Sequence, residues 1–268
     1  MLKAFRAFLP VGIAISGFAG TVADAAPSPC RAVIGIPGNA PFTGLKDGEI
    51  DGVIATTAAA ALRAMGCEVT GRHLPFARLY KWVHAGRLDV ATSVLKTSER
   101  ASLAHYSIPI LTEYTVVMYA LGRKDPPRRL TDLAGLRVGA QLGFRYPTLD
   151  GYGIRLQRER SYQITLKKLS DNLFDAILIG SITGPFLAKR MGYGKTFNYM
   201  PFAIGKAPLG VALSKTAFNH KDLERFNREV KRLTRGSLWR KTLEKHGIGD
   251  LVRTWPMIGD TSLSGPGQ

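Results

Sequence analysis

An arginine stands where a short helix is predicted to begin, in the stretch Thr97-Ser98-Glu99-Arg100. The unpaired N–H groups and the dipole of a helix make its N-terminus positive, so a cation there costs stability unless an anion binds beside it. A guanidinium next to free N–H groups suits a carboxylate or a phosphate. The stretch therefore predicts an anion-binding site at Arg100, with an arginine that only faces water as the alternative.

The elements around Arg100 are predicted to hold it just beyond a buried strand. A helix over residues 75–85 has Leu79, Trp82 and Val83 on one face, and an apolar strand over 88–94 follows it. A polar turn then leads to the arginine. Alternation of strand and helix predicts a parallel sheet with helices on both faces.

The pattern repeats along the chain, which indicates two lobes of similar α/β design. Leu88-Asp89 after one helix recurs as Phe174-Asp175 after another. We expect strands over residues 31–36, 68–74, 88–94, 113–120, 137–142, 174–181, 197–204 and 209–213, and helices over 52–65, 75–85, 162–173, 185–191 and within 221–246.

The N-terminus is typical of a secretory signal peptide over residues 1–25. Lys3 and Arg6 give it a charged start, an apolar stretch follows, and Ala23-Asp24-Ala25 supplies small residues for cleavage. The apolar run is too short and too interrupted for a membrane span. These features predict a protein exported to the periplasm.

The two cysteines, Cys30 and Cys67, fit an oxidising compartment. Each precedes a predicted strand, and the starts of neighbouring parallel strands lie close together. We expect a disulfide, which would stabilise the fold by about 3–4 kcal/mol through the entropy of the unfolded chain. Two separate thiols are the alternative.

The chain is strongly basic, with 37 Lys and Arg against 20 Asp and Glu and a formal net charge of +17. In a cytosolic protein such a balance would suggest binding to nucleic acid. Export and the spread of the cations along the chain argue against a nucleic acid partner. The charge could instead steer anionic solutes or favour an anionic membrane surface.

The motifs around Arg100 resemble those of the bacterial extracellular solute-binding proteins of family 3, the periplasmic receptors of polar amino acid transporters. The family pattern is a helix ending in Gly-x-[Leu/Ile]-Asp, a strand, Thr-x-Glu-Arg, and then Tyr/Phe-Ser-x-Pro. In this sequence it stands as Gly86-Arg87-Leu88-Asp89, Thr97-Ser98-Glu99-Arg100 and Tyr106-Ser107-Ile108-Pro109. A weaker resemblance extends from about Arg31 to Gly247.

The resemblance implies a type II periplasmic binding protein-like fold, with two Rossmann-like α/β lobes joined by two crossover strands and a ligand cleft between them. Ligand would bridge the lobes, and closure would bury it. After the signal peptide, we expect lobe one over residues 26–118 and 208–250, lobe two over 119–207, and a poorly ordered tail over 251–268.

The resemblance also implies a ligand shell built from loops of both lobes. In the family, the arginine that matches Arg100 grips the α-carboxylate of the ligand. An aromatic residue at the position of Phe42 commonly covers the ligand side chain, and the loop from Gly143 offers N–H groups. The predicted ligand-binding residues are Asn39, Phe42, Arg78, Ser93, Leu95, Arg100, Gly143, Phe144, Arg145 and Ser181.

The sequence departs from the family pattern in a consistent direction. Gly180 stands where amino acid binders have an aspartate for the α-ammonium group, and an ammonium buried without a counter-charge is costly. Arg78, Lys96 and Arg145 add cations, whereas the candidate acids are only Asp47, Glu99 and Glu113. These changes predict an anionic or carboxylate-bearing ligand rather than a cationic amino acid. Alternatively, the added cations simply face solvent.

Two enzyme classes remain as alternatives. The Ser-x-x-Lys motif at residues 93–96 and the Ser-Asp-Asn motif at 170–172 match serine β-lactamases, but the first follows a strand where it must open a helix. A secreted dehydratase on the binding-protein fold would use Glu99 or Glu113 as acid or base. We expect no catalytic residue, no cofactor and no metal site, since the histidines show no ligand spacing.

A third alternative is an interaction protein that docks on another periplasmic protein through the basic stretch 221–245. The favoured interpretation is a receptor, expected to be a monomer. Its expected partners are a small carboxylate-bearing ligand and the permease of an ABC transporter, contacted transiently at the membrane.

Overall fold

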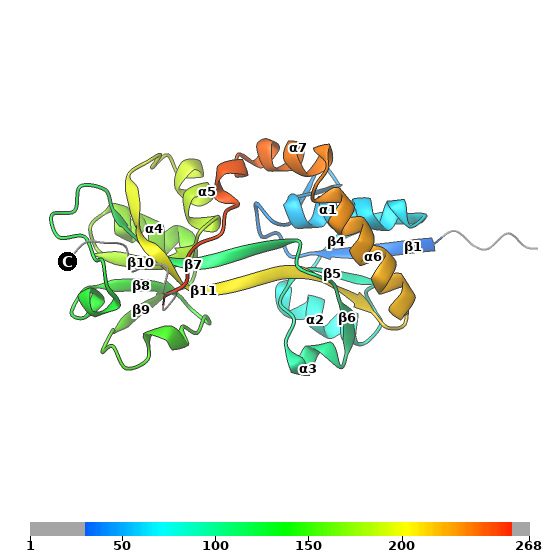
Figure 1. Cartoon of the computed structure of the whole chain (residues 1–268), viewed down its shortest axis with the longest axis horizontal. Helices are drawn as coiled ribbons and strands as arrows, with labels where there is room; N and C mark the ends of the chain where they lie inside the picture. Colours follow the sequence, from blue (N-terminus) through cyan, green and yellow to red (C-terminus); the bar gives the residue numbers. More distant parts are fainter. Residues whose placement is uncertain (1–29, 259–268) are drawn as a thin grey trace, which may run out of the picture.

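The computed structural model describes residues 30–258, which form two α/β lobes joined by two long strands (Figure 1). The expected mixed α/β class is confirmed, and the predicted signal peptide lies outside the described residues. In chain order the elements are β1 (Cys30–Ile36), β2 (Gly44–Lys46), β3 (Glu49–Asp51), α1 (Val53–Ala64), β4 (Cys67–His73), α2 (Phe76–His84), β5 (Val90–Val94), α3 (Ser98–Ala101), β6 (Ala104–Tyr106), β7 (Leu111–Ala120), η1 (Leu130–Leu133), β8 (Val138–Gln141), η2 (Pro147–Leu149), β9 (Leu156–Glu159), α4 (Tyr162–Ser170), β10 (Ala176–Gly180), α5 (Thr183–Arg190), β11 (Phe197–Ser214), α6 (His220–Leu233), α7 (Ser237–His246) and η3 (Gly249–Leu251).

Lobe one is built on a sheet in the order β4-β1-β5-β11, with β6 also paired to β11. Strands β1, β4 and β5 are parallel, and β11 is antiparallel to β5. Helix α1 is rich in alanine and buries most of its residues, because small side chains let it pack closely against the sheet. Phe226 and Val230 of α6 join the same core.

A disulfide joins Cys30 and Cys67, as the sequence predicts. The two residues are direct partners at the start of the parallel pair β1 and β4, with Cα atoms 4.3 Å apart. Because Cys30 and Cys67 are the first residues of two directly paired strands, their side chains lie close enough to form the bond.

Lobe two has the strand order β7-β10-β8-β9, with α4 and α5 packed against it. Strands β8, β9 and β10 are parallel, and β10 is antiparallel to β7. The sequence did not predict β9, because its residues Leu156–Glu159 are mostly polar and pair along one edge only. The helix expected over residues 162–173 ends at Ser170.

The lobes are joined by β7 and β11, which pair with each other along both lobes. β11 is one continuous strand, so the prediction of separate strands over 197–204 and 209–213 is wrong. From Thr115 onward β7 also pairs with β10, so the first crossover lies a few residues before the expected boundary at 118.

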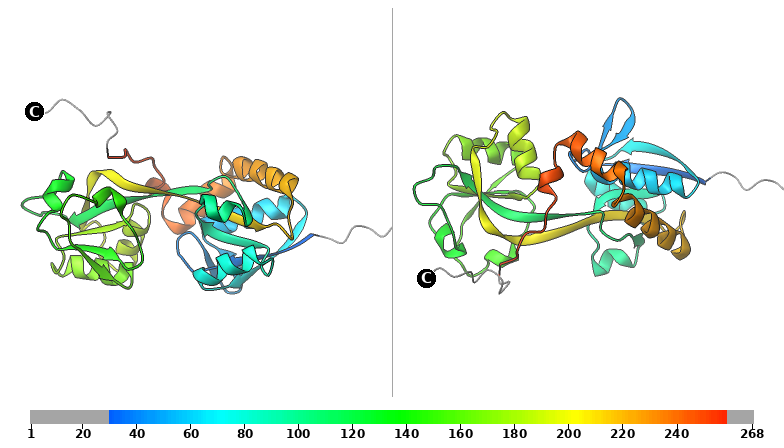
Figure 2. Two further views of the ribbon diagram at one scale, coloured as in Figure 1. Left: turned by 90° about the horizontal axis from the view of Figure 1, so that it is seen from below. Right: turned by 45° about the horizontal axis from the view of Figure 1, so that its top comes forward.

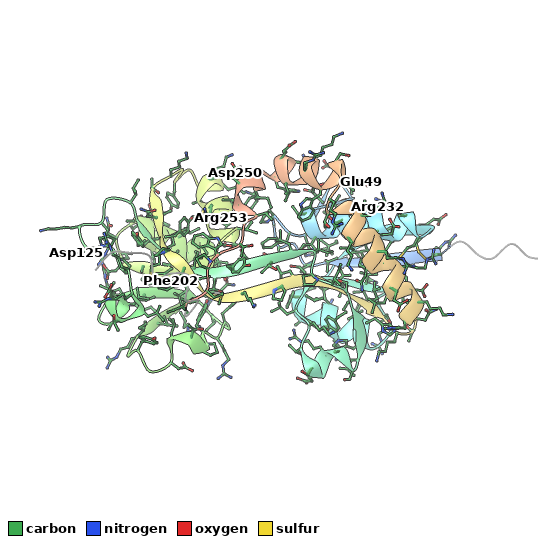
Figure 3. All side chains as sticks on the ribbon, in the orientation of Figure 1. Glu49, Asp125, Phe202, Arg232, Asp250 and Arg253 are labelled. Atoms are coloured by element: carbon green, nitrogen blue, oxygen red, sulfur yellow. A yellow bond between two sulfur atoms is a disulfide. The ribbon has the colours of Figure 1, made fainter. Side chains whose placement is uncertain are left out.

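The segment that follows α7, residues 249–258, runs beside the crossover strands from lobe one to lobe two (Figures 1 and 2). Figure 3 labels Arg253 on this segment between the lobes, and its guanidinium lies 4.5 Å from the centroid of the Trp255 ring. Trp255 is only 7% exposed, and Met257 bridges to Ala203 of β11. The prediction of a poorly ordered tail is therefore wrong from residue 251 to residue 258, because this tryptophan packs into lobe two.

Both lobes use an aspartate in the same way at the amino edge of the sheet. Asp89 accepts a hydrogen bond from the N–H of Val33 at 2.8 Å, and Asp175 accepts one from the N–H of Arg137 at 2.9 Å. The Arg137 guanidinium also binds Asp175 and holds the pKa of that carboxyl well below its usual range. The repeated aspartates thus join neighbouring strands.

Strand direction makes the carboxyl ends of the two parallel sheets face each other. β11 runs from lobe two into lobe one, so β5, which is antiparallel to it, points with β1 and β4 toward lobe two. β7 runs the opposite way, so β10, β8 and β9 point toward lobe one. The loops after these strands form what we call the interlobe face of each lobe, where open α/β sheets bind ligands.

Candidate functional site

Arg100 follows β5 on the interlobe face of lobe one and lies in the short helix α3. Its guanidinium stacks on the ring of Tyr80, 3.9 Å from the ring centroid, and its Nη1 donates to the Tyr80 hydroxyl at 2.7 Å. Nη1 also lies 3.4 Å from the carbonyl oxygen of Leu95. In the described part of the chain, Arg100 forms no ion pair. An aromatic ring, rather than a carboxylate, holds this cation.

Tyr80 fixes both the arginine and the loop before it. The N–H of Leu95 donates to the Tyr80 hydroxyl at 3.3 Å, so this oxygen joins the end of β5 to α2. Burial raises the pKa of Tyr80, against the opposing effects of the Leu95 N–H and Arg100, so the phenol is neutral at neutral pH. Sequence reasoning missed Tyr80, although its place one turn after Phe76 on the same helix face was visible.

Two further predicted residues lie near this arginine. Leu95 is half-buried directly after β5, and its carbonyl faces the Arg100 guanidinium. Arg78 is exposed near the start of α2, and its guanidinium lies 5.6 Å from the centroid of the Trp82 ring. The structure therefore brings Leu95 to Arg100, while Arg78 stacks along its own helix.

The remaining lobe-one predictions differ in their exposure. Asn39 is exposed after β1, and its carbonyl accepts the N–H of Phe42 at 2.9 Å. Phe42 has 0% of its surface exposed and packs in the lobe-one core, so a ligand contact by its ring would require this core to open. Ser93 is 5% exposed, with a φ of 58° beside an irregularity in the pairing of β5 with β11.

The loop after β8 carries the lobe-two predictions Gly143, Phe144 and Arg145, all exposed. The Phe144 ring lies 6.0 Å from the ring of Tyr162, centroid to centroid. After this loop the chain forms only the short 3-10 turn Pro147–Leu149. The loop therefore lacks a long following helix that would align its N–H groups toward an anion.

A cavity of about 330 Å³ lies beside this loop within lobe two. It is lined by Arg145, Tyr146, Pro147, Leu149, Asp150, Ile154, Leu156 and Arg158. No lobe-one residue lines it, so it is separate from the position of Arg100.

A second charged group, Glu113 of β7, lies beside the end of β10 at the interlobe face. The Ser181 N–H donates to the Tyr114 carbonyl at 2.7 Å, and the Tyr114 N–H donates to the Ser181 hydroxyl at 3.3 Å. Ser181, a predicted ligand residue, is buried, and these two hydrogen bonds join the end of β10 to β7. Beside it, Glu113 of β7 accepts the N–H of Thr183 at 2.8 Å.

Sequence reasoning named Glu113 only as one of several candidate acids. Its place next to Gly180 depends on the pairing of β7 with β10, which no local pattern reveals. The available signal was that Glu113 is the only charged residue in the strand Leu111–Ala120.

Comparison with known families identifies the chain. The family of bacterial extracellular solute-binding proteins, family 3, matches it over residues 32–248. The chain belongs to this family. The resemblance carried by the motifs around Arg100 is thereby confirmed, and this family 3 protein is a solute-binding protein.

Solved structures agree with the fold of a type II periplasmic binding protein. The unliganded open form of the L-cystine solute receptor of Neisseria gonorrhoeae matches with a TM-score of 0.68 at 19% identity, covering 85% of this chain and 96% of that one. A mutant of ArgBP from T. maritima matches at 0.61 and 20%, covering 81% and 95%. A histidine kinase sensor domain with similarity to periplasmic binding proteins matches at 0.63 and 20%, also covering 81% and 95%. No curated protein matches the sequence.

The enzyme-like motifs of this solute-binding protein lie in unsuitable places. Ser93 is buried within β5 and Lys96 is exposed beyond it, so the Ser-x-x-Lys motif does not open a helix. Within residues 30–258, no group of three or more His, Cys, Asp or Glu could hold a metal ion. None of the helices in that range has the length and apolar composition needed to cross a membrane.

Proposed function

We propose that this protein is a periplasmic receptor for a small carboxylate-bearing solute, either an amino acid or an organic acid. It captures the solute between its lobes as a monomer and delivers it to the permease of an ABC transporter. Membership of the solute-binding family supports the receptor role. The chemistry of the interlobe faces supports the ligand class.

The unpaired guanidinium of Arg100 carries the proposal. It lies at the carboxyl edge of the lobe-one sheet and is fixed by Tyr80, and it forms no ion pair in the described part of the chain. A guanidinium held flat against an aromatic ring keeps its N–H edge available for a planar carboxylate. Charge-assisted hydrogen bonds of this kind are among the strongest that a binding site can form.

Other cations on the interlobe faces favour an anionic group in the solute. Lys96 follows β5 and Arg145 follows β8, and both side chains are exposed. The net charge of +17 adds to this field, which speeds the encounter with anions at low ionic strength. Lys96 and Arg145 attract the anionic solute over a distance, whereas Arg100 makes the specific contact with its carboxylate.

Capture and release of the solute would depend on bending of the two crossover strands. β7 and β11 connect the lobes, so bending near Glu113 and Ala207, where the two strands pair between the lobes, would bring the interlobe faces together. Closure removes water from the bound carboxylate and strengthens its bond to Arg100. Delivery requires the transporter to favour the open state, which lowers the affinity for the solute.

Thermal unfolding of the purified protein against amino acids and organic acids tests the proposal. A solute at 100 times its dissociation constant stabilises the folded state by about 2.7 kcal/mol, and Arg100→Ala should abolish the shift. Arg87→Ala is the matched control, since Arg87 is exposed before β5, at the edge of the sheet away from lobe two. No stabilisation by any carboxylate, or equal stabilisation of the Arg100→Ala variant, would contradict the proposal.

A further inference from the structure

Helix α6 carries a row of cations along its outer face. Lys221, Arg225, Arg228 and Arg232 follow one another at intervals of three or four residues, and Arg235 continues the row in the turn after the helix. Residues at these spacings lie one above another on the same face of an α-helix. All five side chains are exposed, and we call these five residues the cationic row.

Two members of the cationic row have an acidic partner on a neighbouring face of the helix. An oxygen of Asp222 lies 3.9 Å from Nη1 of Arg225, and an oxygen of Glu229 lies 2.7 Å from Nη2 of Arg232. Exposed ion pairs of this kind stabilise a helix only weakly. They offset part of the charge of the row.

The other three members, Lys221, Arg228 and Arg235, form no ion pair among residues 30–258. Glu224 is the third acid of α6, and its carboxylate lies 3.6 Å from Nε2 of His220 instead. Like charges three or four residues apart destabilise a helix. The cationic row is therefore unfavourable for the isolated protein, and an anionic surface outside the chain would relieve this repulsion.

The opposite face of α6 holds the helix on lobe one. Phe226 and Val230 are buried in the lobe-one core, and α6 packs on α1, α7 and β6, which all belong to this lobe. Figures 1 and 2 show α6 on the outside of lobe one, away from lobe two. A partner that lies against the cationic row would therefore leave the interlobe faces free.

A small cavity of about 80 Å³ opens between the cationic row and the end of α1. It is lined by Ala64, Met65, Arg225, Arg228 and Glu229. Nη2 of Arg225 lies 3.4 Å from the carbonyl oxygen of Met65, so this arginine spans the two helices. An anionic group that enters the cavity meets two guanidinium groups, whereas the Glu229 carboxylate is already paired with Arg232.

The composition of α6 favours a membrane surface over a protein as the partner. The centre of a protein interface depends on aromatic or large apolar side chains. In the described part of the chain, none of the exposed large apolar residues lies on α6. Clusters of Lys and Arg attract an anionic bilayer by charge alone, and a helix that lies flat on the bilayer brings all its cations to the headgroups together. The net charge of +17 acts in the same direction.

We infer that the cationic row holds the protein against an anionic membrane surface, with its guanidinium and ammonium groups bound to the phosphates of lipid headgroups. The inference goes beyond the proposed receptor function, because neither capture nor choice of the solute requires a membrane contact. The surface is also separate from the interlobe faces, so the inference and the receptor function can fail independently.

Sedimentation with lipid vesicles tests the inference. The protein is mixed with vesicles of phosphatidylcholine alone and with vesicles that also contain phosphatidylglycerol, each at low and at high salt concentration. The test variant replaces the three unpaired cations with glutamine, as Lys221→Gln, Arg228→Gln and Arg235→Gln together. A control variant loses the same charge at three exposed cations of lobe two that form no ion pair in the described chain, through Lys124→Gln, Arg160→Gln and Lys195→Gln.

The expected result is that the wild type binds vesicles with phosphatidylglycerol, does not bind phosphatidylcholine alone, and is released by high salt. Each Lys or Arg beside an anionic surface strengthens binding by roughly a factor of five, so the test variant should bind about 100-fold more weakly. The control variant should bind far more tightly than the test variant. Without vesicles, the test variant should unfold at the same temperature as the wild type or higher, because repulsion within the row is removed.

Several outcomes would overturn the inference. They are no binding of the wild type to phosphatidylglycerol vesicles, equal binding to both kinds of vesicle, and equal losses in the two variants. A test variant that unfolds at a lower temperature would show that the cations stabilise the fold itself. Binding to soluble poly-L-glutamate but not to vesicles would favour an acidic protein partner instead. Titration of solutes without vesicles tests the receptor function separately, so a failure of one is not mistaken for a failure of the other.

Discussion

The two interlobe faces hold opposite charges in different surroundings. Arg100 lies on a loop of lobe one that is partly open to water, with one face of its guanidinium covered by Tyr80. Glu113 lies on a crossover strand, and its carboxylate is enclosed next to Gly180 and α5. A charge near water is cheap to maintain, whereas an enclosed charge without a partner destabilises the fold. The comparison teaches that the fold can keep the Arg100 charge at little cost, whereas the enclosed Glu113 carboxylate depends on the N–H groups that open α5.

Arg100→Lys should have the largest effect and would test the lobe-one half of the comparison. Lysine keeps the charge but loses the planar fork and the stacking on Tyr80, so affinity for the solute should fall by about 1.5–3 kcal/mol. The unfolding temperature without solute should fall less than the affinity, because the side chain is partly exposed and loses only its contacts with Tyr80 and the Leu95 carbonyl. Calorimetric titration measures the first and thermal unfolding the second. Full affinity in the lysine variant would show that charge alone suffices.

Gly180→Ala should have the next largest effect and would test the lobe-two half. The added methyl group would meet Glu113 Oε1 at 2.0 Å, so the carboxylate must move away from the N–H of Thr183. Overpacking of this kind lowers the free energy of unfolding by about 1–3 kcal/mol, which thermal unfolding measures. Gly249→Ala provides a comparison at a site where an added Cβ meets no atom within 4 Å and the backbone is not left-handed. A Gly180→Ala variant as stable as the wild type would show that the position of the carboxylate is unimportant.

Tyr80→Phe should have a smaller effect, since it keeps the ring under Arg100 and removes only the hydroxyl. The lost bonds to the Arg100 Nη1 and the Leu95 N–H should lower affinity by about 0.5–1.5 kcal/mol. Tyr106→Phe, which removes the hydroxyl bonded to His84 instead, is the control. Equal losses in the two variants would mean that Tyr80 only supports lobe-one packing.

Glu113→Gln should have the smallest effect, measured on the protein without solute. The folded-state pKa of Glu113 is raised above its usual value of 4.5, so its contribution to stability is present below that pH and is lost as pH rises through the folded pKa. The glutamine variant should therefore unfold at a higher temperature than the wild type at pH 7, and the two should converge below pH 4.5. Each kcal/mol corresponds to about 2–4 °C in a protein of this size. A less stable glutamine variant at pH 7 would show that the charged carboxylate stabilises the fold.

Local patterns in the sequence predicted most of the fold. Helix α1 and strands β4 and β5 follow from apolar periodicity and from glycine at their ends, and the disulfide follows from two cysteines before neighbouring strands. β11 was read as two strands because Lys206 and Pro208 interrupt its apolar pattern where it passes, exposed, between the lobes. The segment ending at residue 258 was missed because a single buried tryptophan anchors it.

The candidate site was predictable from the sequence only where a motif carried it. Arg100 stands in a four-residue motif with a strand before it, so its position was clear from the sequence. The partners that decide its role were not, since Tyr80 is 20 residues away and Glu113 meets Thr183 across 70 residues. The sequence shows that Gly180 carries no acid, but it does not reveal that the structure places the Glu113 carboxylate beside this glycine.

A crystal structure of the protein with the carboxylate that stabilises it most tests the central claim most directly. The account predicts that the solute lies between the lobes, with its carboxylate within hydrogen-bond distance of the Arg100 guanidinium. A bound solute whose carboxylate faces solvent or another cation, with Arg100 contacting only Tyr80 and Leu95, would contradict the account.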